Sequence, residues 1–170
     1  MSGFSGRLDR TQTLFWENSN IANPASTNHV ATSSFAIPAG LLARDGDELV
    51  LETDFIFSGA GSTKGYGANI GHSSFSAGGF SGGVSLFSNG TATSSQSMRA
   101  TTTITRTGPT EAQYRTFCAF SGTAVSNVAY ATSTVNWALA QNIATEVFDV
   151  TGNGAAITIK QTRLTLRRAP

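Results

Sequence analysis

A run of strict alternation between residues 48 and 57 (ELVLETDFIF) is the feature that most limits what this chain can fold into. One parity is mostly apolar and comprises Leu49, Leu51, Thr53, Phe55 and Phe57. The other parity is mostly acidic and comprises Glu48, Val50, Glu52, Asp54 and Ile56. Successive side chains of a β-strand point to opposite faces of a sheet, so a period of two residues indicates a strand. Residues 48–57 are therefore predicted to form a strand with one buried face and one acidic face.

Turn signals at short spacing surround this strand and divide the chain into further strands. A proline-glycine corner at residues 37–40 and a polar turn at residues 44–47 precede it. Asn89-Gly90 is a strong signal for a tight hairpin turn. Residues 138–144 are the one segment that could form a helical turn, and they are few. The other predicted strands are residues 29–35, 64–70, 84–87, 97–107, 111–120, 126–137, 145–150 and 155–168.

About eight or nine strands without a helix of ordinary length predict an all-β fold. Long connections favour an antiparallel β-sandwich of jelly-roll type over an up-and-down barrel. Gly65 and Gly67 alternate with larger residues in their strand, which predicts that one of its faces lies close to another backbone. Residues 71–83 form a Gly/Ser loop in which Phe75 and Phe80 are expected to hold the loop against the body.

The last strand contains an irregularity in its apolar pattern. Ile157 and Ile159 have odd numbers, whereas Leu164 and Leu166 have even numbers. A regular strand cannot place both pairs on one face. The sequence therefore predicts either a β-bulge or bend near residues 160–162, or burial on both faces of this strand.

Composition excludes several classes of function. Charged residues are 12% of the 170 residues and the formal net charge is +1, which argues against nucleic acid and against an anionic membrane surface as partners. A single cysteine, Cys118, cannot form an internal disulfide and is expected to be a buried thiol. One cysteine and two histidines make a zinc site improbable, and no cofactor is expected. The chain begins without a basic-then-apolar leader, so we expect synthesis in a cytoplasm without a secretory signal.

The domain organisation expected from these patterns is an extended N-terminal arm over residues 1–28 and a jelly-roll sandwich over residues 29–170. The arm has no clean period and contains one apolar cluster, Leu14, Phe15 and Trp16. This cluster either folds back onto its own domain or contacts a capsid or neighbouring subunit. The sequence leaves both alternatives open, and we take the three residues as the candidate contact site.

No combination of residues gives strong evidence for catalysis, and the chain is expected not to be an enzyme. Residues 79–83 match the G-x-S-x-G pattern around Ser81, but no helix follows, as a hydrolase would require. A triad of Ser81, His72 and Asp54 has no further support. Glu52 and Asp54 lie about 7 Å apart on one strand face. Such a pair could serve a glycosidase or bind Ca²⁺, but it is more often a solvated face.

Aromatic side chains offer an alternative role in sugar binding. Exposed rings can stack on saccharides, and the candidates are Trp16, Tyr66, Tyr130 and Trp137. Filling of the core is the favoured interpretation for Trp137 and Tyr130.

Three short motifs resemble the jelly-roll domains of tailed-bacteriophage virion proteins. They are Phe35-x-Ile37-Pro38-Ala39-Gly40, then Gly46-Asp47-Glu48-Leu49 before the long strand, and Phe148-Asp149-Val150-Thr151-Gly152 before the last strand. The resemblance covers roughly residues 33–168 and leaves the predicted arm uncovered. The Gly/Ser insertion at residues 71–83 departs from the family's pattern.

This resemblance implies a non-enzymatic structural protein of a virion, commonly trimeric, of the capsid decoration, head-fibre or tail-tip type. A capsid decoration (cement) protein is the expected function, and its partners would be further copies of itself in a homotrimer and the major capsid protein. The alternative is a tail-fibre or receptor-binding module that recognises host surface glycans. In both cases the expected location is the virion. No catalytic residues accompany the family.

Overall fold

The computed structural model describes residues 11–18, 21–22, 29–57, 64–76, 78–92, 96–120, 123–149 and 157–170 of the chain. Within these ranges the fold is all-β, and no helix is long and apolar enough to cross a membrane. The strands of the described residues are β1 (Thr11–Glu17), β2 (Ile21–Ala22), β3 (Val30–Ile37), β4 (Glu48–Phe57), β5 (Lys64–Ile70), β6 (Ser74–Ser76), β7 (Gly79–Ser81), β8 (Val84–Ala92), β9 (Gln96–Gly108), β10 (Glu111–Phe120), β11 (Thr123–Thr134), β12 (Gln141–Asp149) and β13 (Ile157–Arg167).

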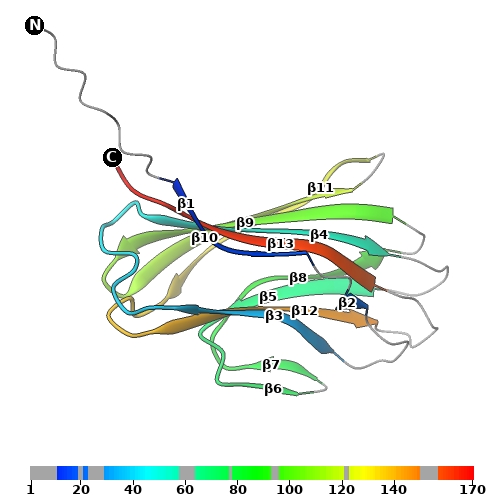
Figure 1. Cartoon of the computed structure of the whole chain (residues 1–170), viewed down its shortest axis with the longest axis horizontal. Helices are drawn as coiled ribbons and strands as arrows, with labels where there is room; N and C mark the ends of the chain where they lie inside the picture. The colour runs from blue at the N-terminus through cyan, green and yellow to red at the C-terminus, as the bar shows by residue number, and fades with distance from the viewer. Residues whose placement is uncertain are drawn as a thin grey trace, which may run out of the picture.

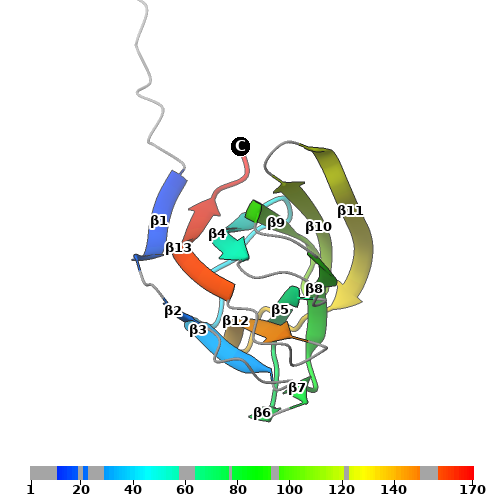
Figure 2. The ribbon, with the colours of Figure 1, turned by 90° about the vertical axis from the view of Figure 1, so that its right-hand side faces the viewer.

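Two sheets pack face to face and lie one above the other in Figure 1. The larger sheet has the order β1-β13-β4-β9-β10-β11, with β2 paired to β13. The smaller sheet has the order β3-β12-β5-β8. The hairpin β6–β7 lies beyond the smaller sheet, on the side away from the larger one, as the end-on view of Figure 2 also shows.

The strand pairing is that of a jelly roll. Without β2 and the hairpins β6–β7 and β10–β11, the strands in chain order are β1, β3, β4, β5, β8, β9, β12 and β13. In this series β1 pairs with β13, β3 with β12, β4 with β9 and β5 with β8, all antiparallel. Such nested pairs describe one long hairpin rolled into two sheets. The predicted antiparallel β-sandwich of jelly-roll type is therefore the observed fold, and β10–β11 widens its larger sheet.

Strand β4 lies where the alternation places it, and its bounds match the predicted residues 48–57. The side chains of its apolar parity are 0–2% exposed and face the core between the sheets: Leu49, Leu51, Thr53, Phe55 and Phe57. Its acidic parity faces outward and is partly exposed, apart from Val50, which is 2% exposed. Each buried aliphatic or aromatic side chain of this kind contributes about 1.5–3 kcal/mol to folding, so the alternation itself fixes which face turns inward.

The irregularity predicted in the last strand is a β-bulge. Along β13 the register to β4 shifts between Ile159 and Gln161, which leaves Lys160 as the extra, exposed residue. The bulge changes the parity of the strand. As a result the isoleucines before it and the leucines after it all face the core, with exposures of 0–1%.

The N-terminal boundary predicted at residue 28 is corrected by the structure. β1 runs antiparallel to β13 and is the first strand of the jelly roll, so residues 11–17 belong to the sandwich and not to an arm. The sequence pattern does not reveal β1 as a strand, because a bulge interrupts its alternation between Thr13 and Phe15. Residues 1–10, 19–20 and 23–28 of the predicted arm lie outside the described residues.

One further local prediction is wrong. Asn89 and Gly90 do not turn the chain but continue β8, opposite Tyr66 and Gly65 of β5. Pairing with a complete neighbouring strand outweighs the turn preference of two residues. Residues 138–144, for which the sequence left a helical turn open, instead lead into β12, which begins at Gln141 and pairs with both β3 and β5.

The prediction for the glycines of β5 also needs correction at Gly67. A Cβ atom at this position would lie 2.7 Å from Oε1 of Glu146, so the close neighbour is a side chain and not a backbone. Glu146 is 7% exposed, and its Oε2 lies 2.8 Å from Nδ1 of His29, which stacks on Phe148. The hairpin β6–β7 covers this pair, because Gly79 approaches both partners.

The Gly/Ser loop at residues 71–83 is held against the body, but through His72 and Gly79, whereas the ring contacts of its phenylalanines lie within the loop. It contains β6 and β7, and the ring centroid of Phe80 lies 4.7 Å from that of His72 and 4.9 Å from that of Phe75. His72 in turn lies 3.3 Å from Nδ2 of Asn142 on β12.

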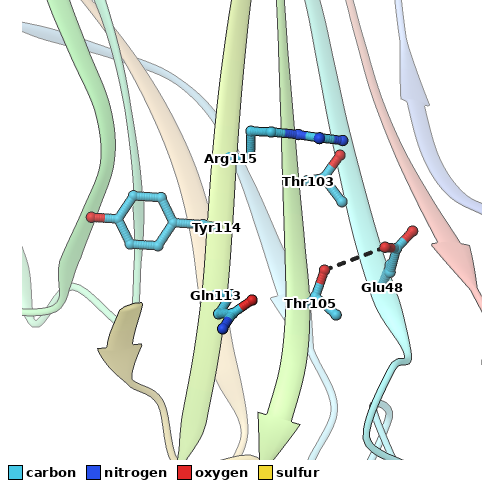
Figure 3. Close-up of a pocket in the computed structure, with 6 residues that line it drawn as sticks. All are labelled: Glu48, Thr103, Thr105, Gln113, Tyr114 and Arg115. Carbon is cyan, nitrogen blue, oxygen red and sulfur yellow. Dashed lines mark hydrogen bonds between the residues drawn. The ribbon is translucent and has the colours of Figure 1, made fainter. Parts of the chain in front are cut away.

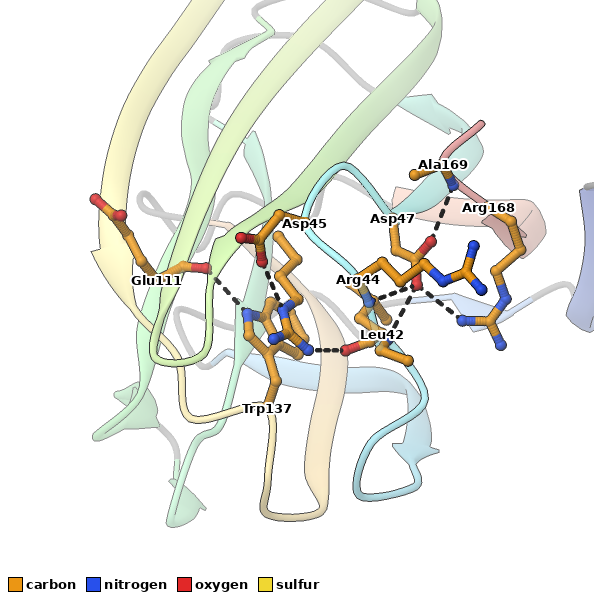
Figure 4. A network of polar contacts seen from close by, with 10 residues as sticks. Leu42, Arg44, Asp45, Asp47, Glu111, Trp137, Arg168 and Ala169 are labelled. Carbon is orange, nitrogen blue, oxygen red and sulfur yellow. Dashed lines mark hydrogen bonds and ion pairs between the residues drawn. The ribbon is translucent and has the colours of Figure 1, made fainter.

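A polar network closes the corner before β4 (Figure 4). The carboxylate of Asp47 is 1% exposed and accepts hydrogen bonds from the backbone amides of Ala43, Arg44 and Ala169 and from the side chain of Arg168, at 2.9–3.1 Å. Burial alone would raise the pKa of this carboxyl, but the hydrogen bonds outweigh burial and lower it. Asp47 thereby ties the loop before β4 to the segment after β13.

Gly46 supports this contact between the loop and the end of the chain. It has a φ of +90°, which disfavours any residue with a Cβ atom, and a Cβ atom there would lie 3.3 Å from that of Ala169. In the predicted turn, glycine is thus favoured at position 46 by its backbone conformation and close packing, and aspartate at position 47 by its hydrogen bonds.

Candidate interaction surface

The outer face of the larger sheet carries the residues that could bind a partner. Directly opposed residues of antiparallel strands point to the same face. The strand registers therefore define a row across five neighbouring strands, from β1 through β13, β4 and β9 to β10. We call it the aromatic row, and its members are Trp16, Arg163, Glu52, Thr101 and Phe117.

Exposed aromatic rings lie at both ends of the aromatic row. Trp16 is 64% exposed and Phe117 is 42% exposed. Leu14 and Phe15 instead pack against the core, and the ring of Phe15 lies 4.2 Å from that of Phe35. Of the three predicted contact residues, Trp16 is therefore the exposed one, and the other two pack against the chain's own core.

The acidic side chains of β4 are paired with arginines of its neighbours. Asp54 accepts two hydrogen bonds from Arg99, at 2.6 and 2.7 Å, which raise the pKa of this guanidinium. Glu52 accepts from Arg163. At the start of the strand, Glu48 lies 3.8 Å from Arg167. Each carboxylate is thus occupied by a cation from the adjacent strand.

This pairing explains both charge patterns seen in the sequence. Glu52 and Asp54 do not form a free carboxylate pair, because each pairs with an arginine on the opposite side of β4. Arg163, Arg167 and Arg168 of the basic C-terminal segment likewise pair with Glu52, Glu48 and Asp47. The acidic face of β4 is therefore a neutralised, solvent-facing surface.

A polar hollow of about 250 Å³ lies on the same face, over β4, β9 and β10. Figure 3 shows its lining residues, which are Glu48, Thr103, Thr105, Gln113, Tyr114 and Arg115. The hydroxyl of Thr105 donates to Oε1 of Glu48 at 3.3 Å. Tyr114 points to the other side of the sheet, and Arg115 extends across β9 beside Thr103. A second, wider depression of about 490 Å³ lies at the opposite end of the face, near Asp54 and Arg99.

The proposed serine triad is not assembled. Asp54 lies on the outer face of the larger sheet, where it pairs with Arg99. Ser81 lies in the hairpin β6–β7, beyond the smaller sheet, and His72 contacts that hairpin through Phe80. The two sheets of the sandwich separate the carboxylate from the other two groups.

The aromatic residues considered for sugar stacking differ in their exposure. Tyr66 is 1% exposed, and its hydroxyl lies 2.9 Å from that of Thr53. Trp137 is 3% exposed and donates from Nε1 to the carbonyl of Glu111, as the core interpretation predicts. Cys118 is fully buried, also as predicted. The side chain of Tyr130 lies outside the described part of the chain, so of these aromatics Trp16 is the one shown to be exposed.

The sequence alone does not indicate a binding role for Phe117 or for the residues of the hollow. The alternation of β10 does place Gln113, Arg115 and Phe117 on one face, and this was the available signal. Their juxtaposition with Thr103 and Glu48 depends on the registers among three strands, which a single sequence does not specify.

Comparisons with known proteins add similarity at the level of shape. No family model matches the chain, and no curated protein matches it. Among solved structures, the CBM2 module of the evolved Dit of Lactobacillus casei BL23 phage J-1 has a TM-score of 0.43 and 11% identity, over 81% of this chain and 70% of that one. Peanut lectin with a 9mer peptide has a TM-score of 0.42 and 9% identity, over 100% and 97%. The structure of infectious bursal disease virus, Gx strain, has a TM-score of 0.30 and 13% identity, over 98% of this chain and 46% of that one. TM-scores and identities this low carry no argument about function.

Proposed function

We propose that this chain is a non-enzymatic structural protein of a virion, a capsid decoration protein that binds the outer surface of a phage head as a symmetric oligomer. The proposal rests on the resemblance of its corner and strand motifs to virion jelly-roll domains and on one structural observation. That observation is the aromatic row, in which an exposed tryptophan stands beside a paired arginine and glutamate.

Trp16 is the side chain best suited to anchor such an interface. Tryptophan and arginine are the residues most enriched among those that dominate binding energy at protein interfaces. Trp16 is opposite Arg163 in the register, so both would be buried by the same partner. A specific interface buries on the order of 1,600 Å², and symmetric multiplicity adds avidity. The partners in this proposal are further copies of the chain, as a homotrimer, and the major capsid protein.

The test is a single substitution at the anchor. Trp16→Ala should leave thermal unfolding nearly unchanged, because the side chain is 64% exposed. It should reduce cosedimentation with purified phage heads that lack this protein by tenfold or more, since a truncated anchor typically costs about 2 kcal/mol. Light scattering after size exclusion would report whether the 17.7 kDa chain forms a trimer.

Leu139→Ala provides the matched control. Leu139 is also a large, exposed apolar residue, at 60%, but it lies in the turn before β12 and outside the aromatic row. Normal binding by both variants would exclude the aromatic row as the interface. Antibody labelling of whole virions in electron micrographs that marks only the tail would exclude a head protein.

The polar hollow favours a second candidate function, recognition of host surface glycans by a tail-fibre or receptor-binding module. Its hydroxyl, amide, carboxylate and guanidinium groups can both donate and accept hydrogen bonds, as a saccharide requires. A glycan array probed with the full chain distinguishes the two candidates, because a decoration protein should give no binder.

A further inference from the structure

Arg115 differs from three other arginines on the outer face of the larger sheet in its pairing with carboxylates. Arg99, Arg163 and Arg167 each pair with a carboxylate of β4. Arg115 is exposed, and no carboxylate of the described residues lies within ion-pair distance of it. Its guanidinium extends over Thr103 at the edge of the hollow (Figure 3). The hollow therefore has one uncompensated positive charge at a defined place.

The other groups of the hollow are arranged in two rows of the sheet. One row joins Glu48, Thr105 and Gln113, and the neighbouring row joins Thr103 and Arg115. By strand geometry the outer two of these strands are about 10 Å apart and the rows are about 7 Å apart. An area of this size accommodates one sugar ring, and the volume of the hollow, about 250 Å³, is also that of a single small ligand.

The functional groups of the two rows favour one class of anionic ligand over others. A guanidinium binds a carboxylate through two parallel hydrogen bonds. The carboxylate of an acidic side chain or a phosphate dianion would satisfy Arg115, but neither anionic group itself carries a hydrogen-bond donor for the nearby carboxylate of Glu48. A saccharide that bears a carboxylate supplies both, because its hydroxyls can donate to Glu48 and exchange hydrogen bonds with Thr103 and Gln113.

We propose that this hollow is a binding site for a saccharide that carries a carboxylate, with Arg115 holding the carboxylate and the Glu48, Thr103 and Gln113 side chains holding ring hydroxyls. Phe117, two residues from Arg115 on the same face, offers an exposed ring beside the hollow. This inference rests on the glycan-binding candidate and is independent of the assembly role proposed for Trp16.

The experiment is a titration of the full ¹⁵N-labelled chain followed by amide chemical shifts. The probes are sodium glucuronate and N-acetylneuraminic acid, with glucose and the methyl ester of glucuronic acid as neutral counterparts and acetate as a carboxylate without hydroxyls. Saturable shifts at Thr103, Gln113 and Arg115 are expected with the acidic sugars. The neutral sugars and acetate should bind at least tenfold more weakly, since a hydrogen bond to a charged group is lost or the hydroxyl contacts are missing.

Substitutions assign the effect to the hollow. Arg115→Ala and Arg115→Gln should each weaken glucuronate binding by about tenfold or more at an unchanged melting temperature, because the side chain is exposed. Arg99→Ala, which removes an exposed arginine of the same face outside the hollow, should leave the affinity within twofold. Two variants of Arg115 keep the test valid if one of them fails to fold.

Each other outcome overturns the proposal in a distinguishable way. Equal binding of glucose and glucuronate would leave the glycan candidate in place but remove the role of Arg115. Equal binding of acetate would indicate a carboxylate site for a protein partner. The absence of any shift at 50 mM sugar would exclude a saccharide site on this face, while binding of heads through Trp16 would be unaffected.

Discussion

The corner before β4 gives the sharpest prediction of stability, through replacement of Asp47 by asparagine. The change keeps the size of the side chain and removes its charge. Asp47 accepts four hydrogen bonds while its side chain is 1% exposed. An asparagine has one carbonyl oxygen, so its amide would face either the backbone N–H of Ala169 or the donors of Ala43, Arg44 and Arg168.

The magnitude follows from these contacts. Loss of a hydrogen bond to a charged group costs about 1.5–3 kcal/mol, and a buried donor without a partner adds about 1–3 kcal/mol. The contributions are not additive, and we expect Asp47→Asn to lower the free energy of unfolding by about 3 kcal/mol. For a chain of this length that corresponds to a melting temperature lower by about 6–12 °C.

The pH dependence of this loss has a defined sign. The pKa of Asp47 is lower in the folded chain than its ordinary value. Its carboxylate therefore stabilises the fold fully above the unfolded-state pKa near 4, and the contribution is lost as the pH falls through the folded-state value. The difference in stability between wild type and Asp47→Asn should be constant from about pH 5 to 7 and should shrink below about pH 4.

Urea unfolding followed by tryptophan fluorescence at several pH values measures both effects. Arg168→Gln serves as the control, because it removes only the cation, whose side chain is 40% exposed, and should cost about 1 kcal/mol or less. A loss below about 1 kcal/mol for Asp47→Asn, or a difference that does not change between pH 7 and pH 2, would refute the role assigned to this carboxylate.

Three further substitutions or probes test the core. Gly67→Ala should destabilise the chain by about 1–2 kcal/mol, since its Cβ would lie 2.7 Å from Glu146, whereas Gly78→Ala, with no atom nearer than 3.8 Å, should be neutral in thermal melts. Tyr66→Phe should cost about 1–2 kcal/mol in urea unfolding, because the buried hydroxyl of Thr53 loses its partner. Burial raises the pKa of the Cys118 thiol to about 12, so the thiol should not react with a maleimide at pH 8 until the chain unfolds, and rapid labelling of the native chain would contradict its burial.

The alternation of apolar and polar residues predicted those features of the fold that depend on one strand alone, namely which of its side chains face the core. The alternation of β4 gave its bounds, and the parity change in β13 indicated, as one of two alternatives, a bulge near residues 160–162, where the structure has it at Lys160. These predictions succeeded because a buried face imposes a period of two residues on any strand, whatever its partner.

The parts that depend on a partner strand could not be predicted. Asn89-Gly90 continues β8 because β5 extends far enough to pair with it, and β1 is recognisable as a strand only beside β13. The hollow is a stronger case, since Arg115 has no acidic partner among the described residues and its strand β10 lies next to β9 and not next to the acidic strand β4. In an order that placed β10 beside β4 instead, Arg115 would lie next to the acidic residues of β4 and could compete for their carboxylates.

The position of β1 also decides how the proposed interface can be tested. If residues 1–28 formed a separate arm, its removal would abolish binding and leave the sandwich intact. Instead β1 covers one edge of β13 and packs Phe15 against Phe35, so its removal would expose core side chains and an unpaired strand edge. Loss of binding by a truncated chain would then report loss of folding as well as loss of contact. Trp16 lies on the same strand but points away from the core, and for this reason a substitution at Trp16 separates the two effects where a truncation cannot.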